Sequence, residues 1–168
     1  MAAGATYEPI TTTTTSSNQT TVSFTSITGS YTDLVLVCAF KNTSSVDIIL
    51  QFNSDGGNNY SYVTFGGDGT TVGDVRGYNT TAIVLDVNAA GFGTDRSIVV
   101  VDIMNYSNTS TAKTVISRVG TVSGAPNVGM TIGTRRNTAA ITTIDISASS
   151  ANTIASGSKF TLYGISAA

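Results

Sequence analysis

The sequence is poor in the residues that carry most enzyme chemistry. Its 168 residues include no histidine, no tryptophan and a single cysteine, Cys38. Histidine is the commonest general base, and both a Ser-His-Asp triad and a Cys-His zinc site require it. Cys38 has no partner for a disulfide and lies in the apolar run Leu34–Phe40, where a thiol acts as a small hydrophobic group. We therefore expect a structural Cys38, no cofactor and no enzyme activity.

One catalytic alternative stays open at this point. A pair of carboxylates can hydrolyse a glycosidic bond without histidine, and the chain has ten acidic residues. The order of residues does not show which carboxylates lie close together, so the sequence identifies no pair.

Charge is also scarce. Charged residues make up 11% of the chain, against roughly 25% in an average globular protein, and the net charge is -2. The only basic cluster is Arg135–Arg136, interpreted as a solvated turn or an ion pair, so no nucleic-acid partner is expected. The longest apolar run, Leu34–Phe40, is far shorter than the ~20 residues of a membrane span, and Met1–Ile10 has no features of a signal peptide. No membrane partner is expected either.

Short β-strand patterns fill most of the chain. Val46, Ile48, Leu50 and Phe52 alternate with polar or smaller neighbours, which places them on one face of a strand. Similar segments recur between turns rich in Gly and Asn, and no segment has a helical period. We predict about ten strands in a single antiparallel β-sandwich of the all-β class, with jelly-roll topology as the first choice. The expected strands are 22–24, 34–40, 46–52, 60–65, 80–87, 97–104, 113–119, 128–132, 141–146 and 160–165.

The first 20 residues are interpreted separately from the sandwich domain, residues 21–168. Thr11–Thr15 is a homopolymer run, and the residues around it are polar and without period. Such a segment cannot bury a face of its own. It is predicted to be an extended arm that orders against a neighbouring subunit, and a frayed terminus is the alternative.

Two glycine-rich loops are candidate ligand sites. Gly66–Gly73 lacks the spacing of a phosphate-binding loop, which favours a hairpin turn. Asn53–Asn59 carries oxygen ligands, and calcium there would need Asp55 and Asp68 to meet in space. Tyr and Asn side chains on such loops could also contact a glycan or a protein.

The low charge indicates assembly with other protein. Stable interfaces are depleted in charged residues, and partners also cover exposed strand edges. A homo-oligomer or a larger assembly is therefore expected.

Several segments resemble small virion-associated proteins of tailed bacteriophages. They cover nearly the whole chain: Met1–Ile10, Gly29–Leu36, Leu50–Tyr62, Asn105–Arg118, Thr138–Asp145 and Gly157–Ile165. The resemblance implies a β-sandwich structural protein of the phage particle, made in the cytoplasm of the bacterial host. It also implies a homotrimer bound to the major capsid protein or another virion protein.

The first hypothesis is a capsid decoration (cement) protein that stabilises the head, with arm residues Tyr7, Glu8, Pro9 and Ile10 as candidate partner contacts. The alternative is a tail or fibre component that binds a host receptor or glycan. Its candidate contacts, on or beside loops 53–59 and 66–79, are Asn58, Asn59, Tyr60 and Tyr78.

Overall fold

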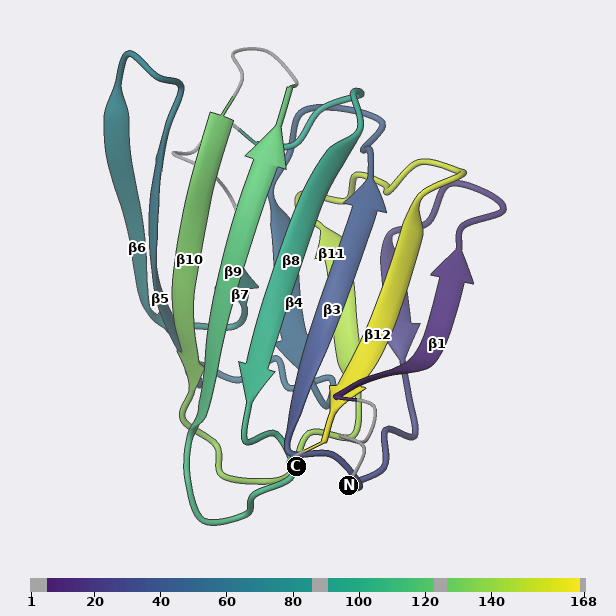
Figure 1. Ribbon diagram of the computed structural model, residues 1–168. Helices are drawn as coiled ribbons and strands as arrows, with labels where there is room; N and C mark the ends of the chain where they lie inside the picture. Colours follow the sequence, from purple (N-terminus) through teal and green to yellow (C-terminus); the bar gives the residue numbers. More distant parts are fainter. Residues whose placement is uncertain (1–5, 86–90, 123–126, 167–168) are drawn as a thin grey trace.

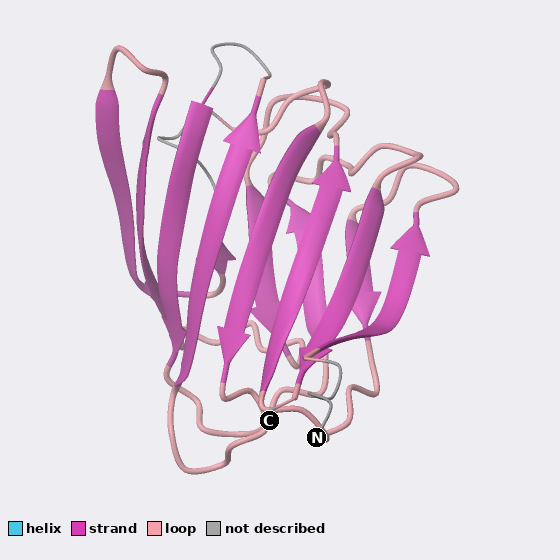
Figure 2. Cartoon of the chain, in the orientation of Figure 1, coloured by secondary structure: helices cyan, strands magenta, loops and turns pink. Residues whose placement is uncertain are grey.

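The chain folds into two antiparallel β-sheets that pack face to face (Figure 1). The computed structural model describes residues 6–85, 91–122 and 127–166, and these contain twelve strands and no helix (Figure 2). The predicted all-β sandwich is confirmed. One sheet has eight strands and the other has four, whereas a jelly roll has eight strands in two sheets, so the jelly-roll prediction is not confirmed.

The larger sheet lies in front in Figure 1 and runs from β1 at one edge to β6 at the other. Its strands, in spatial order, are β1 (Tyr7–Thr14), β12 (Lys159–Ile165), β3 (Asp33–Phe40), β8 (Ser97–Met104), β9 (Lys113–Thr121), β10 (Asn127–Arg135), β5 (Tyr60–Gly67) and β6 (Val72–Thr80). The smaller sheet consists of β2 (Thr21–Phe24), β11 (Ile144–Ala148), β4 (Ile48–Phe52) and β7 (Ile83–Val84).

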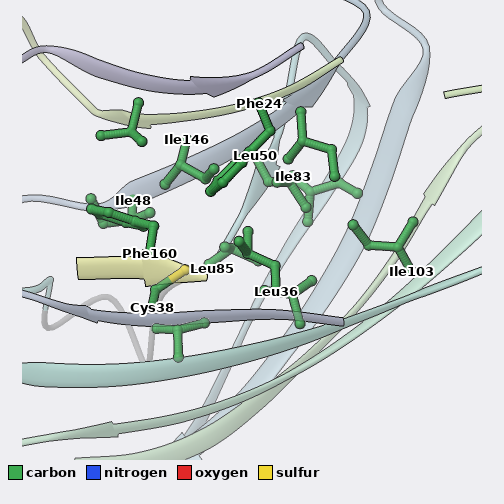
Figure 3. Packing of buried hydrophobic residues seen from close by; sticks show 14 of the residues in the cluster. Phe24, Leu36, Cys38, Ile48, Leu50, Ile83, Leu85, Ile103, Ile146 and Phe160 are labelled. Atoms are coloured by element: carbon green, nitrogen blue, oxygen red, sulfur yellow. The ribbon is translucent and has the colours of Figure 1, made fainter. Parts of the chain in front are cut away.

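The hydrophobic core fills the space between the sheets. Side chains alternate along each strand, so every second residue points inward. In β3 these are Leu34, Leu36, Cys38 and Phe40. Figure 3 shows Leu36 and Cys38 on the side of β3 that faces residues of β2, β4, β7 and β11. The ring centroid of Phe40 lies 6.0 Å from that of Phe160. Full burial of one such side chain contributes about 1.5–3 kcal/mol, so this layer supplies the main driving force for folding.

The segment predicted as an arm contains a strand of the sandwich. Residues 7–14 form β1, which pairs with β12 from Tyr7↔Ile165 to Thr14↔Lys159. Most β1 side chains are exposed, and Ile10 is the one residue of the strand that packs against the hydrophobic core. Main-chain hydrogen bonds hold the strand, and β-branched threonine suits an extended backbone. The domain therefore begins well before residue 21.

A second strand, β6, has no signal in the sequence because its inward positions carry little apolar surface. It lies where the sequence indicated a glycine-rich loop, and it presents Gly73, Val75 and Gly77 to the inside. Gly77 is required there, because a Cβ atom would come within 2.4 Å of the Tyr62 ring. The predicted strand 80–87 is shorter than expected, with β7 at Ile83–Val84, and its residues 86 and 87 lie outside the described residues.

Candidate functional site

The described acidic residues do not form a three-residue metal cluster. Within residues 6–85, 91–122 and 127–166, no three His, Cys, Asp or Glu side chains lie together where they could hold a metal ion. Asp55 accepts hydrogen bonds from Arg135 Nε at 3.1 Å and Nη2 at 3.0 Å, and Asp68 accepts the N–H groups of Thr70 and Thr71. Asp55 precedes β5 and Asp68 follows it, so the strand separates the two carboxylates suggested for calcium.

Cys38 lies in the core, and burial raises the pKa of its thiol. A raised pKa disfavours the thiolate, which is the reactive form of cysteine. The structure therefore places Cys38 where the sequence predicted a structural residue.

The four predicted loop contacts do not share one environment. Tyr60 is fully buried, and its hydroxyl bonds to the N–H and the carbonyl of Phe52. Tyr60 opens β5 at an inward position, so it is a core residue and not the loop contact that the sequence suggested. Asn59 donates to the Asp55 carboxylate, and this contact stabilises the turn.

Arg136 links the remaining predicted loop contacts. It donates from Nη2 to the carbonyl of Asn58 and from Nε to that of Asn59. Its guanidinium carbon also lies 5.3 Å from the ring centroid of Tyr78, within the range of a cation–π interaction. Tyr78 is 77% exposed. Asn58, Asn59 and Tyr78 thus meet around a cation that the sequence had indicated only as part of a turn or an ion pair.

The four predicted arm contacts lie at the start of the edge strand β1. Tyr7 is exposed and makes an edge-to-face contact with Tyr163, while Glu8 accepts a hydrogen bond from the Tyr31 hydroxyl. Pro9 precedes an irregularity in the pairing with β12, and Ile10 packs against the core. Tyr7 therefore presents the largest exposed apolar surface of the four.

The strongest surface feature is the outward side of the eight-stranded sheet, here called the large-sheet face. Nine large hydrophobic side chains are exposed in the described part of the chain. The register places seven of them on β8, β10, β5 and β6 of this face and Tyr7 on its far edge strand β1, and Val122 directly follows β9. They are Tyr7, Phe65, Val72, Tyr78, Ile98, Val122, Val128, Met130 and Ile132. Monomeric proteins seldom gather exposed apolar residues in this way, and large patches of this kind mark interaction sites.

The large-sheet face is also hollowed. Three hollows of about 690, 680 and 540 Å³ lie over β5, β6, β9 and β10, and parts of β3 and β8 line the second. The second surrounds Val128, which is paired with Gly67 on one side and Gly120 on the other. The Gly120 side is open, because a Cβ atom there would contact only Ile98 Cγ2 at 3.6 Å, whereas a Cβ atom at Gly67 would lie 2.6 Å from the Thr71 carbonyl oxygen. Val128 therefore stands above its neighbours with a gap on the Gly120 side.

The charges on this face are balanced. Arg118 Nη2 lies 2.7 Å from Asp102 Oδ2 near the middle of the sheet, and Asp74 and Arg76 project from the edge strand β6. Asp68 and Arg96 also line the second hollow, so acidic and basic groups are balanced in this region.

The outward side of the four-stranded sheet, here called the small-sheet face, is polar. Thr21 and Ser147 hydroxyls are 2.8 Å apart, and Ser23 donates to Asp145 at 2.6 Å. Asp145 also accepts a hydrogen bond from Ser54. These side chains bond to one another across β2 and β11, whereas the paired, half-buried Ile49 and Val84 are outward residues on β4 and β7.

Two cationic side chains are buried beneath the large-sheet face, at the end of the sheet where β9 begins and β10 ends. Lys113 and Arg135 are paired in the register of β9 and β10, and both point inward. The Lys113 ammonium donates to the carbonyls of Asn108, Thr111 and Thr138, which joins the β8–β9 and β10–β11 connections. Burial lowers the pKa of Lys113, and the nearby Arg135 charge adds to the effect. Three carbonyls nevertheless match the three donors of a charged ammonium.

The sequence matches no protein-family model and no curated protein. Among the described residues, no helix is long and apolar enough to cross a membrane. The surfaces described above are the structural observations from which a function can be inferred.

Proposed function

We propose that this protein is a non-enzymatic structural component of a bacteriophage particle, and specifically a capsid decoration protein that binds the major capsid protein. One observation carries the proposal: seven of the nine exposed large hydrophobic residues of the described chain gather on the large-sheet face. A surface of this kind is typical of a site that other protein covers. The low proportion of charged residues supports the same role.

The proposed mechanism is mechanical. Copies of the protein lie across junctions between shell proteins and add buried area that opposes internal pressure in the head. The exposed start of β1, with Tyr7 at its tip and Glu8, Pro9 and Ile10 beside it, is the segment proposed to contact the shell protein. The protein acts as a homo-oligomer, for which the resemblance implies three copies.

The test is the copy number and position of the protein in purified particles, measured by quantitative mass spectrometry and cryo-electron microscopy. The proposal predicts hundreds of copies spread over the head. A few copies confined to the tail would contradict a decoration protein.

A second function is supported by the cluster around Arg136. Tyr78 offers an exposed aromatic ring beside the first hollow, and Arg76 also lines that hollow. Aromatic rings and Asn or Arg side chains are common ligands of sugars, so the alternative is a tail or fibre module that binds a receptor glycan.

A glycan array would test this alternative. Binding that is lost in Tyr78→Ala and retained in the buried control Tyr60→Phe would favour the glycan module. Absence of binding to every glycan by the wild-type protein would remove its support.

A further inference from the structure

One row of outward residues crosses six strands of the large-sheet face. The strand register aligns Ala39 with Ile98, Ile98 with Gly120, Gly120 with Val128, Val128 with Gly67, and Gly67 with Val72. Small and large residues alternate without exception along this row. The second hollow, about 680 Å³, lies over the five residues of the row other than Val72.

An alternating row of this kind is complementary to itself. Consider a two-fold axis that lies in the plane of the interface, parallel to the strands, and passes between Gly120 of β9 and Val128 of β10. The axis places Val128 of one copy opposite Gly120 of the other. It also places Ile98 opposite Gly67, and Val72 opposite Ala39. Each large side chain of this row therefore meets a small residue, and Val128 meets the open space above Gly120, where a Cβ atom would contact only Ile98 Cγ2 at 3.6 Å. Small residues opposite large ones favour close packing of two sheets.

The size of the face fits a stable pair. Neighbouring strands are about 4.8 Å apart, and a strand rises about 3.3 Å per residue. The six strands that lie side by side in the order β3, β8, β9, β10, β5 and β6, each about eight residues long, therefore cover about 29 Å by 27 Å. This is close to the ~800 Å² that each partner buries in a standard protein interface.

The charges also suit a second copy. The same axis sets Arg76 of one copy opposite Val35 of the other, one strand away from Asp102, because these residues lie in the row that contains Ile116, Ile132 and Val63. Asp102 also pairs with Arg118 of its own chain. The attraction of Arg76 for Asp102 of the other copy adds specificity to the apolar contact.

The sheet edges are less suited to pairing. Pro9 has no N–H group and precedes an irregularity in β1, and β6 carries Asp74, Arg76 and a second irregularity opposite Tyr60 and Ser61. Proline, charges and bulges are features that protect an edge from another strand. Association through the face is therefore favoured over association through an edge.

We infer that a second copy of this chain covers the large-sheet face, with Val128 of each copy in the gap above Gly120 of the other. This inference rests on the proposed assembly function and names the partner. It favours a two-fold pair over the trimer implied by the resemblance. A ring of three uses two different patches on each subunit, whereas the exposed apolar residues here share one face.

Exchange of the two central residues tests the inference. Gly120→Val sets valine against Val128 of the partner, and Val128→Ala leaves a gap opposite Gly120. The double variant, which carries both substitutions, sets the new valine opposite the new alanine and restores complementarity. A Cβ atom at Gly120 meets only Ile98 Cγ2 at 3.6 Å, an ordinary contact, so Gly120→Val should fold. Thr21→Val on the small-sheet face is the matched control.

Sedimentation equilibrium gives the association constant of each variant, and thermal melting monitored by circular dichroism confirms folding. The wild type and Thr21→Val should have the mass of two chains of 17.2 kDa. Each single exchange should weaken association at least about tenfold, and the double variant should recover to within about threefold of the wild type. A monomeric wild type, or a double variant no better than the single variants, would overturn the inference.

Purified particles separate this inference from the proposed function. A wild-type dimer that is absent from the head would leave the inference intact and contradict the decoration role. A monomer that is present on the head, and that is lost from it in Gly120→Val, would overturn the inference and show that the shell protein covers this face.

Discussion

Both outward faces of the sandwich are formed by antiparallel strands, but the side chains that they expose to water differ in polarity. On the small-sheet face, Thr21 bonds to Ser147, and Ser23 bonds to Asp145. On the large-sheet face, Val72 and Val128 are 86% and 69% exposed and pack against little of their own chain. Alternation explains the inward side of both sheets, but it leaves the outward side free to vary. The fold and the proposed assembly therefore have separate determinants in this protein.

The largest expected effect concerns the inward side of β10, beneath the large-sheet face. Arg135 is 2% exposed and pairs with Asp55, whose side chain is 16% exposed. Arg135→Met removes the cation and leaves this carboxylate without its partner, which should lower the free energy of unfolding by about 3 kcal/mol. Urea unfolding measures the change.

Arg136→Met is the control for that change, because Arg136 follows Arg135 and is exposed. It should lower the free energy of unfolding by less than about 1 kcal/mol. Equal losses in the two variants would show that burial of the Arg135–Asp55 pair does not stabilise the fold.

An intermediate effect is expected on the small-sheet face. Asp145 is 8% exposed and accepts hydrogen bonds from Ser23 and Ser54. Asp145→Ala leaves both hydroxyls without this acceptor, which should lower the free energy of unfolding by about 1–2 kcal/mol. The mass in sedimentation should stay that of the wild type. A change in mass without a change in stability would reverse the proposed roles of the two faces.

The smallest expected effect is a change of stability with pH, and it arises from Asp55, which lies on neither outward face. Partial burial raises the pKa of Asp55, but hydrogen bonds from Gly57, Arg135 and Asn59 outweigh it and leave the pKa below its ordinary value. A lowered pKa in the folded state gives stability above the unfolded pKa of about 3.9, and this stability is lost as the pH falls through the folded value.

The wild-type melting temperature should therefore fall between about pH 5 and pH 2, and the fall should be shallower in Asp55→Asn. Melting curves across this range provide the measurement. Parallel curves for the two proteins would remove Asp55 from the account of acid stability.

The sequence predicted the strands whose inward residues are apolar. Val46–Phe52 alternates, Ser97–Met104 contains the apolar run Ile98–Val101, and the structure has β4 and β8 there. Edge strands were missed because β1 packs only Ile10 against the core and β6 points glycine inward. A terminal polar run and a glycine-rich loop have the same local composition as such strands, and only pairing with a neighbour distinguishes them.

The residues of the candidate site were harder to predict than the strands, because their positions depend on which strands pair and in which register. Tyr60 follows a turn in sequence, but its position in the register of β5 sends it into the core. The burial of Lys113 could not be predicted, because its three carbonyl partners come from two separate connections. The row from Ala39 to Val72 joins six strands, so no local pattern reveals it.

One measurement tests the difference between the two faces most directly. Cys38, the single cysteine, is 1% exposed, so the wild type offers no accessible thiol. Met130→Cys and Thr21→Cys each place one reactive thiol on one face, and Met130 lies outside the row that contains Val128. The rate of maleimide labelling is then followed as the protein concentration rises from about 1 µM to about 1 mM. We predict that labelling of the Met130→Cys variant slows as copies associate, whereas labelling of the Thr21→Cys variant does not change. Equal rates in the two variants over the whole range would contradict burial of the large-sheet face by a second copy.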